Sequence, residues 1–404
     1  MKTVQPGLLI LAGAFLADCA GEEINRSAGN ALSSKDWKRI AIIGHSFSDR
    51  NIWPYLMRQA LTDAGRPEPI LISNAGFGDV AADNLRRLEW AVLKHDPDLA
   101  IIMALAHNSR KMTDDEFRAA MEEMITKLQA KGAKVLLLYG YMRCPAGMQP
   151  ADMKNTDKVK EVVKRESDKM AAEAQRPGSE KRGDAQIQCD LAKKHGCLIA
   201  DMRPYQVRAF ERGDWQWEGD RVHPSSEGYR TLARVALDAL GYEKIAVPAK
   251  LKVKVLPGLV TPLRIRAARE GEAALNEKTV LGVKPDDAWV TYVLPEKDPL
   301  GSFWNDQMRE EGYAMSVEKV VGKANRYIGF ATIESDKPAT VYVNTSGGLK
   351  SVWFNGRRIN RAGEWNGFHA GAKRIPVELK PGANTLVFES DSRFALNVTP
   401  NALW

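Results

Sequence analysis

Five short apolar runs, separated by segments with helical spacing, constrain the fold of the first 245 residues more than any other feature. Each run is five to eight residues long, and the first is rich in β-branched residues, as expected of strands buried on both faces. The runs are RIAIIG (39–44), PILIS (69–73), DLAIIMAL (98–105), KVLLLYGY (134–141) and CLIAD (197–201). Buried strands that alternate with helices predict an α/β domain, in which helices cover both faces of a parallel sheet.

The segments between these runs carry the signals of amphipathic helices. We predict helices at 53–65, 80–93, 113–132 and 225–241, and two more within the charged stretch 151–195. The helix at 113–132 has the clearest ends, because Thr113 can cap it, Glu116 completes a capping box and Gly132 stops it.

The pattern changes after about Pro248. Helical spacing disappears, and short alternating runs such as ATVYVNT (339–345) are separated by tight turns such as NG and PGAN. This pattern predicts an all-β, jelly-roll-like sandwich over 251–404. The break at 242–262 contains three prolines and is the predicted linker to a first domain at 37–245.

The N-terminus has the pattern of an export signal. Lys2 precedes the apolar stretch GLLILAGAFLA (7–17), which is too short to span a bilayer comfortably. The tetrapeptide that ends at Cys19 is similar to a bacterial lipobox, although Asp18 is atypical. We therefore expect residues 1–20 to be a signal peptide or lipoprotein signal. The protein would be periplasmic, secreted, or attached to the outer membrane through a lipid on Cys19.

Charge and cysteine spacing exclude several classes of protein. The net charge of +7 is spread along the chain without a basic block interleaved with aromatics, so nucleic acid is not an expected partner. Beyond Cys19, the cysteines are Cys144, Cys189 and Cys197. Either Cys189 pairs with Cys197 in an oxidising compartment, or all three are small buried side chains. No zinc, P-loop or dinucleotide pattern is present, and no metal or cofactor is expected.

Candidate catalytic residues follow from the sheet, because ligands bind at the carboxyl ends of parallel strands. Ser46 comes directly after the first strand, and Asp220 and His223 come just before the last helix. A serine hydroxyl needs a base to take its proton, and His223 could serve. Asp220, three residues earlier on one side of a helical turn, could orient the imidazole and stabilise its charged form, unless it is a simple cap.

A developing oxyanion also needs donors. The backbone N–H groups of Ser46 and Gly78 and the side-chain amide of Asn108 could supply them, with Gly76 as the alternative to Gly78. His45 adjoins Ser46, but neighbouring side chains in an extended segment point apart. We therefore expect His45 to make a structural bond, and His107 to be structural or to lie on the rim of the site.

These residues resemble the sequence blocks of the SGNH, or GDSL-type, hydrolase family. The matches are GHS (44–46), Gly78, Asn108 and DRVH (220–223), over about residues 37–245. The family usually has aspartate where this chain has His45, and Gly-x-Asn-Asp where it has AHNS (106–109). The resemblance implies a three-layer α/β/α domain and a serine esterase. More loosely, 341–390 resembles a galactose-binding-like sandwich of the kind appended to carbohydrate enzymes.

Residues that could bind substrate surround the strand ends. Arg50, Arg110 and Arg143 could bind a carboxylate or sulfate at the cleft rim, or could be solvated surface. Trp215 and Trp217 could stack on a sugar ring, or could belong to the core.

The sequence thus predicts an esterase that removes acyl groups, above all O-acetyl groups, from a carbohydrate through an acyl-enzyme. Its partner would be an acylated carbohydrate or another small ester. Two alternatives stay open at this point. One is a lipase or arylesterase that acts on simple acyl esters, and the other is a non-catalytic carbohydrate-binding or surface-assembly protein. The sequence does not indicate which sugar is bound, or an oligomeric state.

Overall fold

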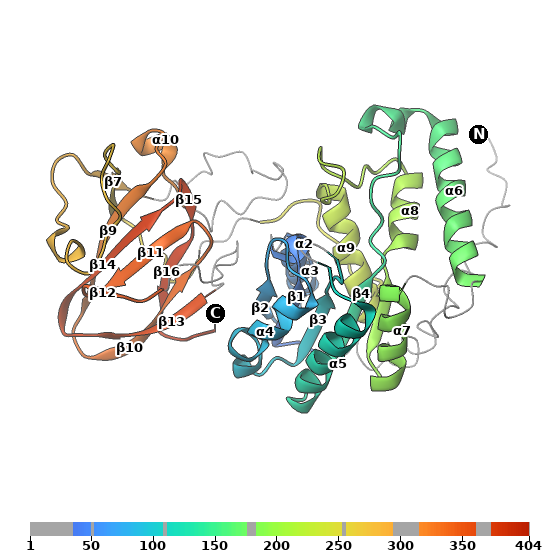
Figure 1. The fold of residues 1–404 in the computed structure, drawn as a ribbon, viewed down its shortest axis with the longest axis horizontal. Coiled ribbons are helices and arrows are strands. Elements are labelled where there is room, and N and C mark those ends of the chain that lie inside the picture. Colours follow the sequence, from blue (N-terminus) through green and yellow to red (C-terminus); the bar gives the residue numbers. More distant parts are fainter. Residues whose placement is uncertain are drawn as a thin grey trace. The chain divides into compact units, whose positions relative to one another are not determined.

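The computed structural model describes residues 35–49, 52–107, 111–175, 183–252, 256–293, 315–360 and 373–403. The chain divides into two compact units, Met1–Lys250 and Leu251–Trp404 (Figure 1). Within the described residues, no helix is both long enough and apolar enough to cross a membrane.

The first unit is built on a five-stranded parallel sheet with the strand order β2-β1-β3-β4-β5. Its strands are β1 (Arg39–Gly44), β2 (Ile70–Ala75), β3 (Leu99–Met103), β4 (Lys134–Tyr139) and β5 (Leu198–Asp201). The predicted parallel sheet is confirmed, and each strand lies within one or two residues of its apolar run. The order reverses between β1 and β3, where the carboxyl ends of parallel strands leave a crevice for ligands.

Helices cover both faces of this sheet (Figure 1). On one face lie α4 (Ala81–Ala91), α5 (Asp114–Ala130) and α7 (Gly183–His195). On the other face lie α3 (Ile52–Asp63), α8 (Arg203–Glu211) and α9 (Ser226–Ala239), and α6 (Thr156–Gln175) packs on α8. The remaining short helices are α2 (Ser46–Asp49), η2 (Leu93–His95) and η3 (Pro150–Lys154).

The predicted cap of α5 is present, because the backbone N–H of Glu116 donates to Thr113 Oγ1 (3.2 Å) and the N–H of Thr113 donates to Glu116 Oε2 (2.8 Å). Helix α8 was not predicted. It is nine residues long, and its buried apolar residues are too few to establish a helical period.

The second unit consists of antiparallel strands in a six-stranded sheet (β12-β11-β14-β9-β6-β7), a three-stranded sheet (β13-β10-β16) and a pair (β15-β8). The strands are β6 (Leu263–Ala267), β7 (Val290–Tyr292), β8 (Met315–Ser316), β9 (Tyr327–Ser335), β10 (Ala339–Thr345), β11 (Leu349–Phe354), β12 (Arg357–Arg358), β13 (Lys373–Leu379), β14 (Gly382–Ser390), β15 (Arg393–Phe394) and β16 (Leu396–Thr399). Two short helices, η5 (Val280–Gly282) and α10 (Glu318–Val321), lie between strands.

The two larger sheets of this unit share one apolar core. Val343 of β10 and Leu396 of β16 pack in the same buried cluster as Leu386 and Phe388 of β14. The predicted NG turn joins β11 to β12, with positive φ at both Asn355 and Gly356 as a tight hairpin requires. An all-β second domain is therefore confirmed, whereas its jelly-roll topology and sugar binding stay predictions.

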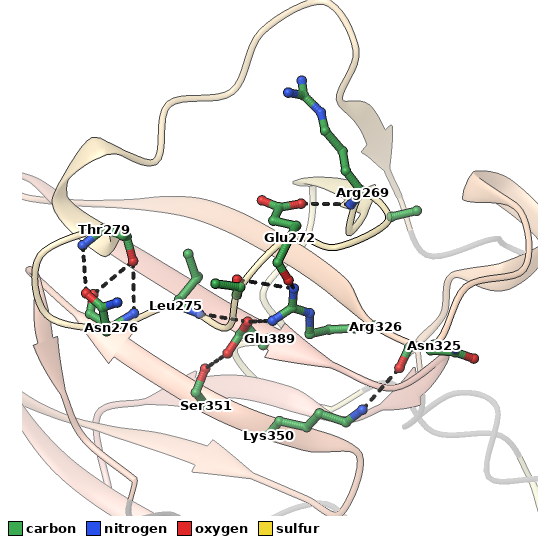
Figure 2. Close-up of polar contacts among 12 residues, drawn as sticks. Arg269, Glu272, Leu275, Asn276, Thr279, Asn325, Arg326, Lys350, Ser351 and Glu389 are labelled. Atoms are coloured by element: carbon green, nitrogen blue, oxygen red, sulfur yellow. Dashed lines mark hydrogen bonds and ion pairs between the residues drawn. The ribbon is translucent and has the colours of Figure 1, made fainter.

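A buried ion pair between Arg326 and Glu389 holds the loop after β6 against the six-stranded sheet (Figure 2). The loop lies on the face of this sheet that is opposite to the shared core. Glu389 of β14 is 3% exposed and accepts hydrogen bonds from Arg326 Nη1 (2.8 Å), the Leu275 backbone (3.0 Å) and Ser351 Oγ (2.8 Å). Arg326 also donates to the carbonyls of residues 272 and 273 in the loop. The Glu389 carboxylate thus accepts hydrogen bonds from three donors. Both Glu389 and Arg326 hydrogen-bond the loop and so fix its position.

We expect Glu389→Ala to lower the free energy of unfolding of the second unit by about 3 kcal/mol, because it leaves the Arg326 guanidinium without its buried partner. Urea unfolding followed by tryptophan fluorescence measures the loss. Glu378→Ala is the matched control, since the exposed Glu378 of β13 accepts only from Thr340 among the described residues, and it should cost less than about 0.5 kcal/mol. Equal losses in the two variants would contradict a special contribution from the buried pair.

Candidate active site

The chain turns sharply at the end of β1 and places Ser46 at the start of α2. A Cβ atom on Gly44 would lie 2.9 Å from the Met103 carbonyl oxygen and 3.0 Å from Ser48 Oγ, so glycine is the residue that fits there. The carbonyl of His45 accepts from the N–H groups of Ser48 (2.8 Å) and Asp49 (2.9 Å), which closes the turn. The geometry of this turn therefore fixes the position of Ser46 at the carboxyl edge of the sheet.

Ser46, His223 and Asp220 form one hydrogen-bonded chain, as the sequence predicts. His223 Nε2 lies 3.0 Å from Ser46 Oγ, although 177 residues separate the two in sequence. Nδ1 of the same ring hydrogen-bonds Asp220 Oδ2. Asp220 Oδ1 accepts from the backbone N–H groups of Val222 and His223, both at 2.9 Å. The carboxylate is thus both the predicted partner of the imidazole and a local cap.

The charge state of Asp220 follows from these contacts. Partial burial disfavours the charged form, but hydrogen bonds from the His223 ring and from two backbone N–H groups outweigh it and lower the pKa of the carboxyl. An ionised Asp220 accepts from a protonated Nδ1. Nε2 is then left with a lone pair that can take the proton of Ser46.

The turn that carries Asp220 and His223 is not the predicted helical turn. Arg221 has a left-handed φ of 64°, and the backbone N–H groups of Val222 and His223 donate to Asp220 Oδ1, which favours a tight turn over a helix. The segment is closed on itself, because Glu218 N donates to the His223 carbonyl (2.8 Å) and Ser225 N donates to the Gln216 carbonyl (3.0 Å).

Arg221 ties this turn to the loop after β4. Its Nη2 donates to the Pro145 carbonyl (3.1 Å), and its own carbonyl accepts from Cys144 N (3.3 Å). Sequence reasoning missed Arg221, because a left-handed arginine in a polar loop has no periodicity or motif of its own. Its contacts make it a residue that positions the Asp220–His223 turn.

The prediction that Trp217 offers a stacking face to a sugar is wrong. Trp217 is 1% exposed, its Nε1 donates to the Met142 carbonyl (2.9 Å), and its ring packs in a core cluster with Phe210. Trp215 is half-buried and lies edge-on to Trp217, with ring centroids 5.3 Å apart. A sugar contact by Trp215 stays a prediction.

The loop after β2 contains a tight turn from Gly76 to Asp79. The N–H of Asp79 donates to the Gly76 carbonyl (3.1 Å), and Gly78 has a φ of 80°, which glycine adopts without strain at the third position of such a turn. Phe77 occupies the exposed second position. The donor role of Gly78 stays a prediction.

A buried polar network behind this loop holds the strand ends together. Asn84 Nδ2 donates to the carbonyls of Gly44 (2.8 Å) and Asn74 (3.1 Å), and Arg87 Nε donates to Asn74 Oδ1 (3.0 Å). Arg87 also pairs with Asp79, whose pKa is raised by burial although the guanidinium opposes this shift. These residues were not predicted from the sequence. The available signal was the presence of Asn84 and Arg87, three apart, on the face of a predicted helix that should be apolar.

His45 is buried and uncharged. Burial, and next the nearby His223, lower its pKa to about 3. Its ring packs edge-on against Phe47 at 4.5 Å between centroids, and no described residue hydrogen-bonds its Nε2. The expected structural bond is therefore not seen at this nitrogen among the described residues and stays a prediction, whereas the ring packs on Phe47. His107 is exposed, and its backbone bridges to Lys111.

The remaining predictions concern one described arginine, the cysteines, and residues that the structure does not describe. Arg143 is exposed in the segment that follows β4. Asn108, Arg50, Arg110 and the N-terminal segment with Cys19 lie outside the described residues. Cys144 and Cys197 are free thiols, so the Cys189–Cys197 disulfide is wrong. Burial raises the pKa of Cys197 to about 11, which keeps it a thiol at neutral pH.

We expect His45 to make the protein less stable in acid. Its pKa is about 3 when folded and about 6.5 when unfolded, so between these values the unfolded chain binds one more proton. The stabilising contribution is complete above about pH 6.5 and falls by about 1.4 kcal/mol per pH unit toward pH 3. His45→Gln should flatten the dependence of unfolding free energy on pH, measured by urea unfolding at pH 4.5–7. The exposed-site control His107→Gln should keep the wild-type slope, and parallel curves for wild type and His45→Gln would refute the assignment.

Part of the first unit is similar to a known protein family. A model of the GDSL-like lipase/acylhydrolase family matches residues 42–231, a stretch that contains Ser46, Asp220 and His223. No curated protein matches the sequence.

Similar solved structures each cover about half of this chain. They include a variant of an acetyl xylan esterase from Geobacillus stearothermophilus (16% identity, 51% of this chain, 95% of that chain, TM-score 0.38). A lipase/acylhydrolase from Enterococcus faecalis (18%, 52%, 98%, 0.35) and another acetyl xylan esterase (19%, 50%, 98%, 0.37) are also among them. Lipases and acylhydrolases are hydrolases of esters. Residues 42–231 of this chain belong to the GDSL-like lipase/acylhydrolase family.

Proposed function

We propose that the first unit is a serine esterase in which Ser46 is the nucleophile and His223 is the general base. The observation that carries the proposal is the 3.0 Å contact between Ser46 Oγ and His223 Nε2, with Asp220 on the other ring nitrogen. A nucleophile within hydrogen-bond reach of a base, which is itself oriented by a third group, is the arrangement that acyl transfer needs.

The reaction proceeds in two halves. His223 Nε2 takes the hydroxyl proton as Ser46 Oγ attacks the ester carbonyl, and Asp220 stabilises the imidazolium that forms. The imidazolium then protonates the alcohol oxygen as the bond from the acyl carbon to that oxygen breaks, which leaves an acyl-serine. Water, deprotonated by the same imidazole, attacks the acyl carbon and releases the acid and the free Ser46 hydroxyl.

The tetrahedral oxyanion of each half needs preorganised donors. We assign this role to the N–H groups of Ser46 and Gly78 and to the side-chain amide of Asn108. The turn at Gly76–Asp79 supports the choice of Gly78, because a backbone with φ of 80° and no Cβ allows close approach of the substrate.

The substrate that we propose is an O-acetylated carbohydrate. The second unit supports it, because a sandwich of two antiparallel sheets around one core is an architecture often appended to carbohydrate enzymes. Arg143, with Arg50 and Arg110 on the sequence pattern, would favour a sugar that bears a carboxylate or sulfate.

We expect Ser46→Ala to lower kcat/KM for a chromogenic acetyl ester at least about a thousandfold, since it removes the nucleophile, and His223→Ala to do the same. Mass spectrometry after treatment with a fluorophosphonate should show one adduct, on Ser46, that both variants lack. Ser335→Ala in the second unit and His195→Ala on α7 are matched controls and should retain activity. Full activity in Ser46→Ala, or an adduct on another serine, would overturn the assignment. Retained activity in His223→Ala alone would mean that another base serves Ser46.

The acyl and alcohol parts of the substrate are tested separately. We expect kcat/KM to fall as the acyl chain lengthens from acetyl to octanoyl on one alcohol, and acetate to be released from an acetylated polysaccharide. A preference for long acyl chains would favour a lipase. Hydrolysis of no ester at all would favour a non-catalytic carbohydrate-binding protein.

We also propose that the protein is exported, on the pattern of residues 1–20. Expressed in a Gram-negative host, it should be found outside the cytoplasm, with an N-terminus, determined by mass spectrometry, that begins at or near Cys19. If Cys19 carries a lipid, the wild type should partition with membranes and Cys19→Ser should not. A cytoplasmic protein that retains Lys2 would contradict export.

A further inference from the structure

A large apolar side chain lies exposed beside the candidate base. Phe77 is 75% exposed, and its ring stacks on the His223 imidazole with centroids 5.9 Å apart and planes 17° from parallel. Val222, next to His223 in the chain, is also exposed, at 37%. An exposed aromatic ring from one loop thus stacks on the imidazole, and an exposed valine adjoins His223 in the chain.

The exposed ring is held in place. Phe77 is in the Gly76–Asp79 turn, and Asp79 forms a buried ion pair with Arg87 of α4. On another side of the imidazole, the buried Phe47 makes an edge contact at 5.4 Å between centroids. His223 therefore lies between a buried phenylalanine and an exposed one. The fixed turn makes Phe77 part of a formed surface.

The chemistry of the reaction determines which part of a substrate contacts this surface. The imidazolium must give its Nε2 proton to the departing alcohol oxygen, so that oxygen lies within hydrogen-bond distance of Nε2. The carbons attached to it then extend past the imidazole, on which Phe77 stacks. The acyl carbon is instead bonded to Ser46 Oγ, whereas the ring of Phe77 contacts His223.

The shape of the surface favours a ring over a chain. An alkyl chain is best buried in an enclosed groove, whereas Phe77 is an open, flat, apolar face. A pyranose has a flat face of C–H groups and a rim of hydroxyl groups that stay hydrated, which suits stacking on one exposed aromatic ring.

We propose that Phe77 is a leaving-group subsite that stacks on the C–H face of a sugar ring. This inference rests on the proposed esterase function and deepens it, because it assigns the sugar to the alcohol side of the ester. Phe77 thus offers an exposed stacking face, which the buried Trp217 cannot.

Binding is tested first, without catalysis. Saturation-transfer NMR with methyl β-D-xylopyranoside as the probe should show transfer to the ring protons in wild type and in Phe77→Trp, and none in Phe77→Ala. Leu281→Ala, which removes a 70% exposed side chain in the second unit, is the control and should bind as wild type does. Absence of transfer in wild type, or unchanged transfer in Phe77→Ala, would overturn the subsite.

Kinetics then locate the contact. For acetylated methyl β-D-xylopyranoside, Phe77→Ala should raise KM about tenfold, the loss expected from one aromatic contact, with kcat nearly unchanged. For ethyl acetate, whose leaving group is too small to reach Phe77, KM and kcat should stay as in wild type. An equal loss with both esters would mean that Phe77 only supports His223. A loss that grows with acyl length on one alcohol would place the acyl chain there instead. Either result overturns the proposal.

The two proposals fail differently. If wild type hydrolyses no ester but the pyranoside still binds through Phe77, the esterase function fails and the sugar surface stands. If acetyl esters are hydrolysed but Phe77→Ala changes neither sugar binding nor the preference between leaving groups, the esterase function stands and the subsite fails.

Discussion

The side-chain amide of Asn84 is the contact on which the geometry of the site most depends. It is completely buried and donates to the last carbonyl of β1 and to a carbonyl of β2, and so it holds the two strand ends on which the loops of Ser46 and Phe77 begin. A buried amide without such partners would be costly, so the network is stable only when both strands are in register. Arg87 and Asp79 extend the same constraint into the turn that carries Gly78.

Charged and aromatic groups occupy different sides of the His223 imidazole. Asp220 supplies negative charge on one ring nitrogen, and aromatic rings occupy two other sides of the imidazole. His45, the second histidine nearby, is kept neutral by burial, so it adds no positive charge that would disfavour the imidazolium form of His223. The neighbour that first suggests a base thus contributes packing, and the proposed base comes from a distant loop.

The sequence was sufficient for the parts of the fold that local patterns determine. The five strands, the capping box at Thr113 and the NG hairpin all follow from period, cap and turn chemistry, and Ser46, Asp220 and His223 follow from strand-end placement together with motif spacing. What it could not supply depends on long-range packing. The burial of Trp217, the left-handed Arg221 and the Asn84 network are set by partners far away in sequence, and the short α8 lacks enough residues to show a period. Phe77 was not predicted, because the sequence around an aromatic residue between two glycines does not indicate whether its side chain is exposed or buried.

The separation of 177 residues between Ser46 and His223 has a consequence for the biogenesis of the protein. Ribosomes add about 5–20 residues per second, so His223 is made roughly 10 s or more after the serine. Until α9 docks beside β5, the nascent chain holds a serine with an ordinary, unactivated hydroxyl. Under the proposed function, an incomplete chain therefore cannot hydrolyse esters. The time at which activity appears reports when the first unit has been completed.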